Sequence, residues 1–272
     1  MPPPLNPLAF SALVLAGSMA ALWLLSLPLR NASIVDAFWG SAFAVAAWGA
    51  ALAAGVPLGS PRTALALALV TLWAARLSLH LLLRNAGHDE DPRYAAMRRG
   101  HGARFWWVSL FTVFLLQAAL AWAISLPVQL AVLSSGPLGL LDGLAALTWL
   151  AGFAFEVVGD LQLTRFRADP ANRGRALDTG LWRYTRHPNY FGDALLWWGF
   201  GLLGVAAGAP WTLFAPALMT FLLVKVSGVA LLEKGMAERR PAYRDYVERT
   251  NAFLPWRPRP AQSSQSEAPR RL

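Results

Sequence analysis

The chain has 272 residues, of which 56% are hydrophobic and only 14% are charged, and its formal net charge is +9. Soluble domains carry about 25% charged residues, so this composition excludes an ordinary soluble protein and indicates several membrane spans. Because the sequence contains no cysteine, it excludes disulfides, thiolate metal sites and cysteine nucleophiles.

Seven segments are apolar over the roughly 20 residues that a bilayer core requires. The first of them lacks a basic leader, since Met1 to Asn6 carry no charged side chain, and is expected to be a retained helix. The sequence therefore predicts an all-α polytopic membrane bundle of about seven transmembrane helices. The predicted spans are 7–28, 33–54, 64–83, 105–127, 141–162, 189–207 and 211–232.

Loop charge predicts the orientation of this bundle. Arginine and lysine gather in connections 3–4 and 5–6 and after the last span, whereas the other side holds only Arg62. The positive-inside rule then places the N-terminus outside and the C-terminus in the cytoplasm of a bacterial inner membrane. This topology accounts for the net charge without nucleic-acid binding. One transmembrane domain over 1–256 is expected, followed by a disordered basic cytoplasmic tail over 257–272.

Ionisable side chains inside predicted spans are the strongest functional signal. An Asp, Lys or Arg costs about 2.5–3.5 kcal/mol at mid-helix, so these side chains are expected to face the bundle interior and to bind one another or a polar ligand. The alternative is a set of buried ion pairs that only fix helix packing. These residues are Asp36, Arg76, His80, Glu156, Asp160, Asp193 and Lys225.

A polar stretch over 180–193 leads directly into the sixth predicted span. Pro188 suits the first turn of a helix, and Asn189 and Asp193 are four residues apart, so both lie on one helical face. The arginines of 165–175 offer forks for phosphate oxygens. Alternatively, these arginines only follow the positive-inside rule and bind anionic lipid. Together with the membrane-edge carboxylates, the stretch predicts a nucleotide site.

Four stretches of the chain carry a resemblance to a known family: 31–40, 73–94, 184–193 and 246–256. They are similar to the steroid 5α-reductase superfamily, in its bacterial branch with a domain of unknown function. The third is shared with sterol C14- and C7-reductases, and its His-Pro-x-Tyr-x-Gly core also occurs in isoprenylcysteine and phospholipid methyltransferases. Two departures concern the substrate: Val35-Asp36 stands where steroid reductases have Gln-Glu, and Trp73 stands where they have Tyr.

The resemblance implies NADPH at the cytoplasmic ends of the later helices and an NADPH-dependent oxidoreductase that acts on a CH–CH bond of a lipid. Asp36 and Arg76 are the expected catalytic residues. No metal site and no obligate protein partner are expected, and the partners are a lipid-soluble small molecule and membrane lipids. The expected cofactor-binding residues are His80, Glu156, Asp160, Arg167, Arg175, Tyr184, His187, Asn189, Tyr190, Asp193, Glu233 and Tyr246.

Several alternatives stay open at this point. Asp36 either donates a proton to a substrate carbonyl or forms a structural ion pair with Arg76. The chain is either the reductase, an S-adenosylmethionine-dependent lipid or isoprenylcysteine-type methyltransferase, or a lipid-binding or transport protein without catalysis. The absence of an inverted repeat argues against the last.

Overall fold

The structure is a computed structural model that describes residues 6–226 and 241–260. Over these residues the chain forms helices and turns and contains no strand, as the all-α prediction requires. The chain divides into two compact units, Met1–Trp149 with Trp197–Met219 (unit 1), and Leu150–Leu196 with Thr220–Leu272 (unit 2).

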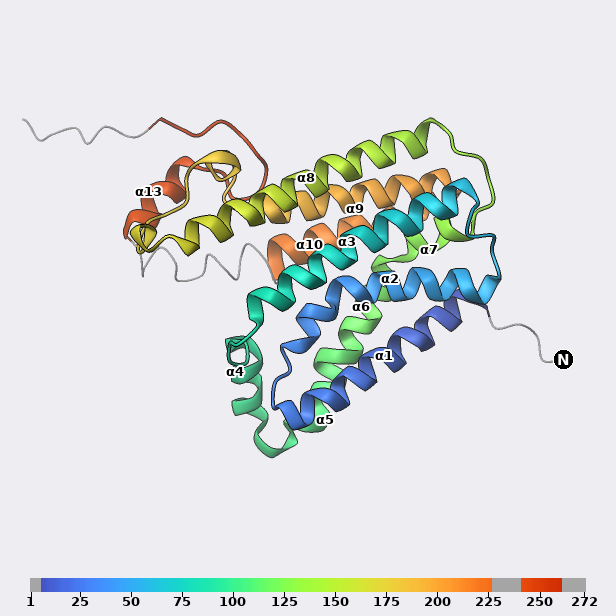
Figure 1. The fold of residues 1–272 in the computed structure, drawn as a ribbon, viewed down its shortest axis with the longest axis horizontal. Coiled ribbons are helices and arrows are strands. Elements are labelled where there is room, and N and C mark those ends of the chain that lie inside the picture. Colours follow the sequence, from blue (N-terminus) through green and yellow to red (C-terminus); the bar gives the residue numbers. More distant parts are fainter. Residues whose placement is uncertain (1–5, 227–240, 261–272) are drawn as a thin grey trace, which may run out of the picture. The chain divides into compact units, whose positions relative to one another are not determined.

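Unit 1 begins with three antiparallel helices that lie side by side: α1 (Pro7–Leu29), α2 (Ile34–Ala54) and α3 (Pro61–Asn85), shown in Figure 1. α1 starts at a proline after Asn6, whose side chain accepts a hydrogen bond from the Leu8 N–H. It ends at Arg30, whose φ of 50° is left-handed. α2 ends at Gly55 with φ 60°, where glycine adopts the left-handed cap without strain.

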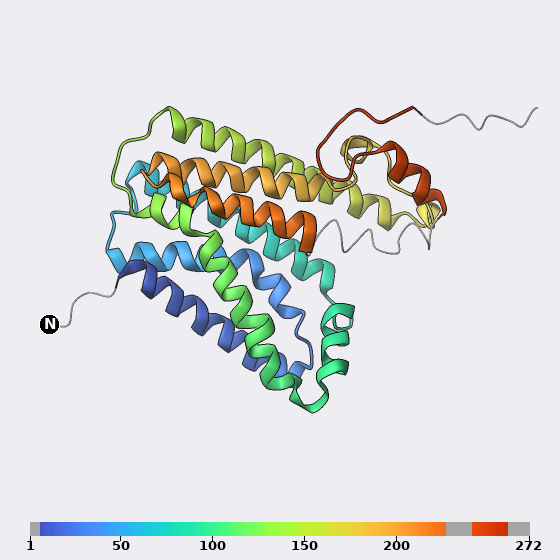
Figure 2. The same cartoon turned by 180° about the vertical axis from the view of Figure 1, so that it is seen from behind.

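The helical run that contains the fourth predicted span begins before that span. It extends over Pro92–Ile124, and its first turns are polar. It comprises α4 (Pro92–His101), a 3-10 turn (Gly102–Arg104), α5 (Phe105–Ser109), a π-helical segment (Leu110–Leu115) and α6 (Leu116–Ile124). α7 (Leu126–Leu133) follows, and Figure 2 shows this green run beside α1 and α2.

The remaining helices are α8 (Leu140–Ala168), α9 (Pro188–Ala206), α10 (Phe214–Phe221), the π-helical Leu222–Val226 and α13 (Pro241–Arg249). Short 3-10 turns lie at Pro170–Asn172, Gly180–Arg183 and Pro210–Leu213. The first half of α8 and the second half of α9 belong to unit 1, and their other halves belong to unit 2.

Five helices of the described residues are long and apolar enough to cross a membrane, so the chain is an integral membrane protein. They correspond to the first five predicted spans. α9 and the shorter apolar helix Pro210–Val226 lie at the sixth and seventh predicted spans and are not among the five.

An aromatic cluster forms the core of unit 1. The Phe43 ring lies 5.4 Å from the Trp73 ring and 4.7 Å from the Trp197 ring, centroid to centroid, and all three side chains are fully buried. α8 and α9 approach closely beside this cluster, since a Cβ on Gly199 would lie 2.8 Å from the Trp149 backbone nitrogen. The glycines of α9 therefore serve helix packing, as their apolar sequence context predicts.

Candidate functional site

In unit 1, Asp36 is held at the start of α2 by two residues of α4. Its Oδ1 accepts a 2.6 Å hydrogen bond from the Tyr94 hydroxyl, and its Oδ2 lies 2.7 Å from a guanidinium nitrogen of Arg93. Gln117 on α6 donates to the Tyr94 oxygen at 3.3 Å. Asp36 was expected either to donate a proton to a substrate or to form an ion pair with Arg76. The structure shows an ion pair, and its partner is Arg93.

A second group of contacts fixes the α3–α4 connection to the start of α2. Glu90 accepts hydrogen bonds from Arg98 at 2.8 Å and from the Ala32 N–H at 2.8 Å. Burial raises the pKa of Glu90, but these hydrogen bonds outweigh burial and leave the pKa below its usual value. Asp91 behaves in the same way: burial raises its pKa, and the hydrogen bonds from Arg93 lower it further than burial raises it.

The other two expected site residues of unit 1, Arg76 and His80, lie on α3 and are half-buried. Trp73, three residues before Arg76 on the same helical face, is fully buried in the aromatic core. This face of α3 therefore runs from the core of unit 1 past the two polar residues toward the end of the helix.

In unit 2, glycines bring the second half of α8 against the start of α9. A Cβ on Gly152 would overlap the backbone of Leu196 and Gly192, and a Cβ on Gly192 would overlap the backbone of Glu156. The approach is somewhat less close at Gly159, where a Cβ would lie 3.0 Å from the backbone nitrogen of Asn189. Only residues without a side chain permit this approach.

This approach brings together the expected cofactor residues of α8 and α9. The Asn189 amide nitrogen donates to Asp160 Oδ1 at 2.9 Å. Glu156, Asp160 and Asp193 are all at least 92% buried, with exposed fractions of 3%, 8% and 8%. The His187 ring is buried and stacks on the Tyr190 ring with 5.6 Å between centroids.

The Asn189 side chain has an unused hydrogen-bonding capacity. The carbonyl oxygen Oδ1 of Asn189 is buried and accepts no hydrogen bond from any residue of 6–226 or 241–260. Asn189 therefore does not cap α9 through this oxygen. A buried acceptor without a donor is costly, which makes it a place where a ligand N–H would bind favourably.

Two other expected site residues belong to the scaffold of unit 2. The Tyr246 hydroxyl donates to the Trp182 carbonyl, and the Trp182 indole donates to the Gly159 carbonyl at 3.1 Å. Tyr184 is 44% exposed, and its carbonyl accepts from the Trp256 N–H at 2.9 Å. These bonds fix the 180–187 segment to the chain that follows α13.

Arg186 strengthens this attachment. Its guanidinium donates to the carbonyls of Val247 and Thr250 at the end of α13, while its backbone N–H donates to Asn251 at 2.9 Å. A cation at a helix C-terminus is favourable because the last carbonyls lack partners within the helix. Arg186 thus attaches the end of α13 to the segment that leads into α9, next to His187.

Two sets of arginines in unit 2 lie in different surroundings. Arg165, Arg167, Arg173 and Arg175, expected near phosphates, are all exposed. A cavity of about 550 Å³ has instead three other arginines on its wall, together with Asp178 and Gly180. Asp178 lies 3.9 Å from one of them, Arg249. The three arginines are Arg183, Arg249 and Arg259.

Glu233, the remaining expected cofactor residue, lies outside the described residues. The sequence interpretation missed Tyr94, Arg93 and Gln117 as partners around Asp36. The sequence does contain a signal for Arg93 and Tyr94. Asp91-Pro92 is an N-cap followed by a first-turn proline, and this pair marks the start of the helix that carries both residues. The three arginines of the cavity could not be predicted from local sequence, because residues near positions 180 and 250 come together only when the chain folds.

Comparison with known proteins gives a family and one relative. The profile of the family described as "Protein of unknown function (DUF1295)" matches residues 22–250. An uncharacterized protein of Schizosaccharomyces pombe is 29% identical over 266 residues, which cover 86% of this chain and 75% of the yeast protein. No solved structure matches the chain.

Proposed function

The chain belongs to the family of unknown function DUF1295, and we propose that it is a membrane-embedded, NADPH-dependent reductase of a polarised C=C bond in a steroid-like or other lipid. The proposal includes kinship with the steroid 5α-reductase superfamily. The observation that carries it is the buried polar group of α8 and α9, with Asn189 fixed by Asp160 and its carbonyl oxygen left without a donor.

The residues of unit 2 fit a dinucleotide in two respects. A carboxamide or an adenine amine offers the N–H that Asn189 Oδ1 lacks, and the aromatic His187–Tyr190 pair offers a flat face. Arginine forks suit phosphate oxygens, and unit 2 presents Arg183, Arg249 and Arg259 on one cavity wall. When bound, NADPH would supply a hydride for the β-carbon of the substrate.

The proton required by this reaction is assigned to the Asp36–Tyr94 pair. As the C=C bond is reduced, electron density moves to the conjugated carbonyl oxygen, which then takes a proton. Asp36 accepts hydrogen bonds from Arg93 and Tyr94, so the Tyr94 hydroxyl holds the proton of the pair and points it at Asp36. For transfer, that hydroxyl would turn from Asp36 to the substrate oxygen, and water would restore the proton after turnover.

The proposal includes a topology of seven spans with the N-terminus outside and the C-terminus in the cytoplasm of a bacterial inner membrane. α9 and Pro210–Val226 would be the sixth and seventh spans. An apolar substrate can then enter from the lipid and a charged cofactor from the cytoplasm.

The experiment that tests the proposal is thermal unfolding of the detergent-purified full chain with and without nucleotide. NADPH should raise the unfolding temperature, and Asn189→Ala should weaken its affinity about tenfold, the usual effect of one lost buried hydrogen bond. Asn172→Ala is a matched control, because it also loses one side-chain amide bond, to the Phe166 carbonyl, outside the proposed site. An unchanged NADPH affinity in Asn189→Ala, or no NADPH stabilisation, contradicts the proposal.

A second candidate is an S-adenosylmethionine-dependent lipid methyltransferase. The observation in its favour is that Glu156, Asp160 and Asp193 are all buried on α8 and α9, and carboxylates suit a cationic ligand. The same measurement separates the two, since stabilisation by S-adenosylmethionine and not by NADPH would select the methyltransferase.

A further inference from the structure

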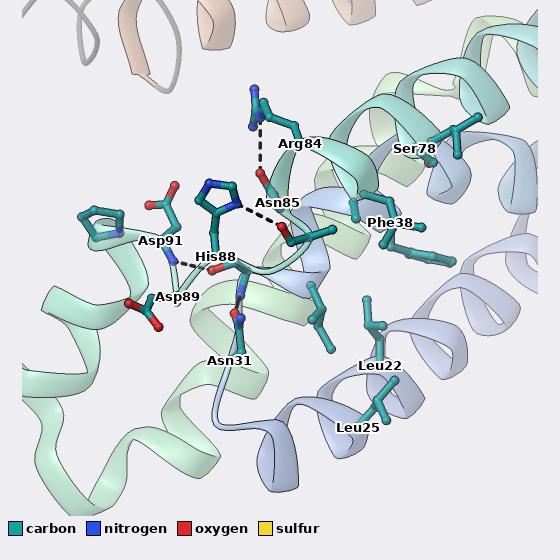
Figure 3. Close-up of a pocket in the computed structure, with 17 residues that line it drawn as sticks. Leu22, Leu25, Asn31, Phe38, Ser78, Arg84, Asn85, His88, Asp89 and Asp91 are labelled. Carbon is teal, nitrogen blue, oxygen red and sulfur yellow. Dashed lines mark hydrogen bonds between the residues drawn. The ribbon is translucent and has the colours of Figure 1, made fainter. Parts of the chain in front are cut away.

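A second cavity, of about 850 Å³, lies entirely in unit 1 between α1, α2, the end of α3 and the α3–α4 connection. We call this cavity the α1–α3 pocket. Its two ends differ in chemistry. Figure 3 shows Asn31, His88, Asp89 and Asp91 gathered at one end and Leu22, Leu25 and Phe38 at the other.

The apolar end belongs to the membrane-spanning part of the helices. Leu25, Leu79 and Leu82 are 53%, 56% and 58% exposed, so their side chains form an open apolar wall. At about 1.5 Å per residue, Leu79 lies roughly 7–8 Å along α3 from Arg84. The pocket thus changes from apolar to charged over the depth at which a membrane lipid changes from acyl chain to headgroup.

The polar end holds one cation and one anion with spare capacity. Arg84 is exposed and donates only a 3.2 Å bond to the neighbouring Asn85, and it has no ion pair among the residues that the structure describes. Asp91 is already bound by the Arg93 guanidinium at 2.8 Å. Asp89 is exposed, and no salt bridge to it is formed within 6–226 or 241–260.

We propose that the α1–α3 pocket binds a glycerophospholipid whose headgroup carries a primary ammonium, such as phosphatidylethanolamine. Arg84 binds the phosphate, and Asp89 accepts hydrogen bonds from the ammonium, which pairs each charge with its opposite. The leucine wall contacts an acyl chain. The pocket is lined neither by the proposed cofactor residues of unit 2 nor by Asp36 and Tyr94, so its occupant is distinct from the substrate and cofactor of the proposed reductase.

The test is native mass spectrometry of the full-length chain in detergent with equimolar phosphatidylethanolamine, phosphatidylcholine and phosphatidylglycerol. Phosphatidylcholine keeps the phosphate but has no ammonium N–H, and phosphatidylglycerol has no cation. Phosphatidylethanolamine should be retained about twofold to fivefold more than either, the range for an exposed charge pair. Equal retention of all three, or a preference for either competitor, overturns the proposal.

Two variants assign the preference to the pocket. Asp89→Asn should abolish discrimination between the ethanolamine and choline lipids, and Arg84→Gln should lower retention of all three. Both side chains are exposed, so neither change should impair folding. The matched controls, Asp245→Asn on α13 and Arg99→Gln on α4, alter exposed residues that do not line the pocket. Retained preference in Asp89→Asn, or equal loss in the controls, places the lipid elsewhere and overturns the proposal.

Discussion

At the scale of single residues, Asp36 and Tyr94 carry the test of catalysis. Asp36→Asn and Tyr94→Phe keep the shape of the pair but remove the carboxylate or the hydroxyl, so turnover of an enone lipid should fall about 10²–10⁴-fold. NADPH affinity should stay unchanged, since that site is built from α8 and α9. Steady-state kinetics with saturating NADPH measures the effect.

Arg93→Gln is the control for this pair. It removes the 2.7 Å ion pair but leaves the hydrogen bond between Tyr94 and Asp36. Because Arg93 is 42% exposed, its loss should cost little stability and little turnover. If all three variants lose the same stability and none loses turnover, the pair is structural only.

Glu90 provides a pH-dependent contribution to stability. Its pKa in the folded chain is below its ordinary value of 4.5 because the hydrogen bonds from Arg98 and Ala32 outweigh burial. A lowered folded pKa means that the contribution is complete above about pH 4.5 and is lost as the pH falls through the folded value. The Arg98 side chain is 37% exposed, so about 1 kcal/mol is expected.

The measurement compares unfolding of wild type and Glu90→Gln between pH 3 and pH 7, about the range in which a carboxyl titrates. Wild type should be more stable near neutral pH, and the difference should shrink in acid. A difference that persists unchanged at the lowest pH would mean that the charge of Glu90 does not contribute.

At the scale of helices, the packing of α8 on α9 depends on Gly192. A Cβ there would overlap the Glu156 backbone, so Gly192→Ala should destabilise the chain by about 1–3 kcal/mol and weaken the stabilisation by NADPH. Gly17→Ala is the matched control, because nothing lies within 4 Å of its would-be Cβ in α1. Alanine there should be neutral or slightly stabilising. Equal effects of the two substitutions would show that close packing at Gly192 is unimportant.

Helices and their partners were predictable to different degrees. Hydropathy alone locates the first five spans, because the bilayer imposes a fixed apolar length. The start of α4 at Pro92 was missed, since its polar first turns have no hydropathy signal. The bond between Asn189 and Asp160 joins residues 29 positions apart, and one sequence does not specify such a pairing. The helical spacing of Asn189 and Asp193 only indicated that both face one side.

At the scale of the whole molecule, one ion pair supports the alternation of the connections. Arg62, after the second span, binds Asp142, at the start of α8, with 2.8 Å between Nε and Oδ1. Connections 2–3 and 4–5 must therefore lie on the same side of the membrane, as the alternation requires. The pair is almost fully buried, so Arg62 is neutralised and adds little to the charge of that side.

The topology itself is tested by alkaline phosphatase fusions, which are active only outside the cytoplasm. Fusions after Gly174, in the arginine-rich connection 5–6, and at the C-terminus should be inactive, because the positive-inside rule places both in the cytoplasm. A fusion after Gly208, between α9 and the Pro210–Val226 helix, should be active if α9 crosses the membrane. If only five helices span, the Gly208 fusion is inactive like the other two. An active C-terminal fusion would instead reverse the predicted orientation.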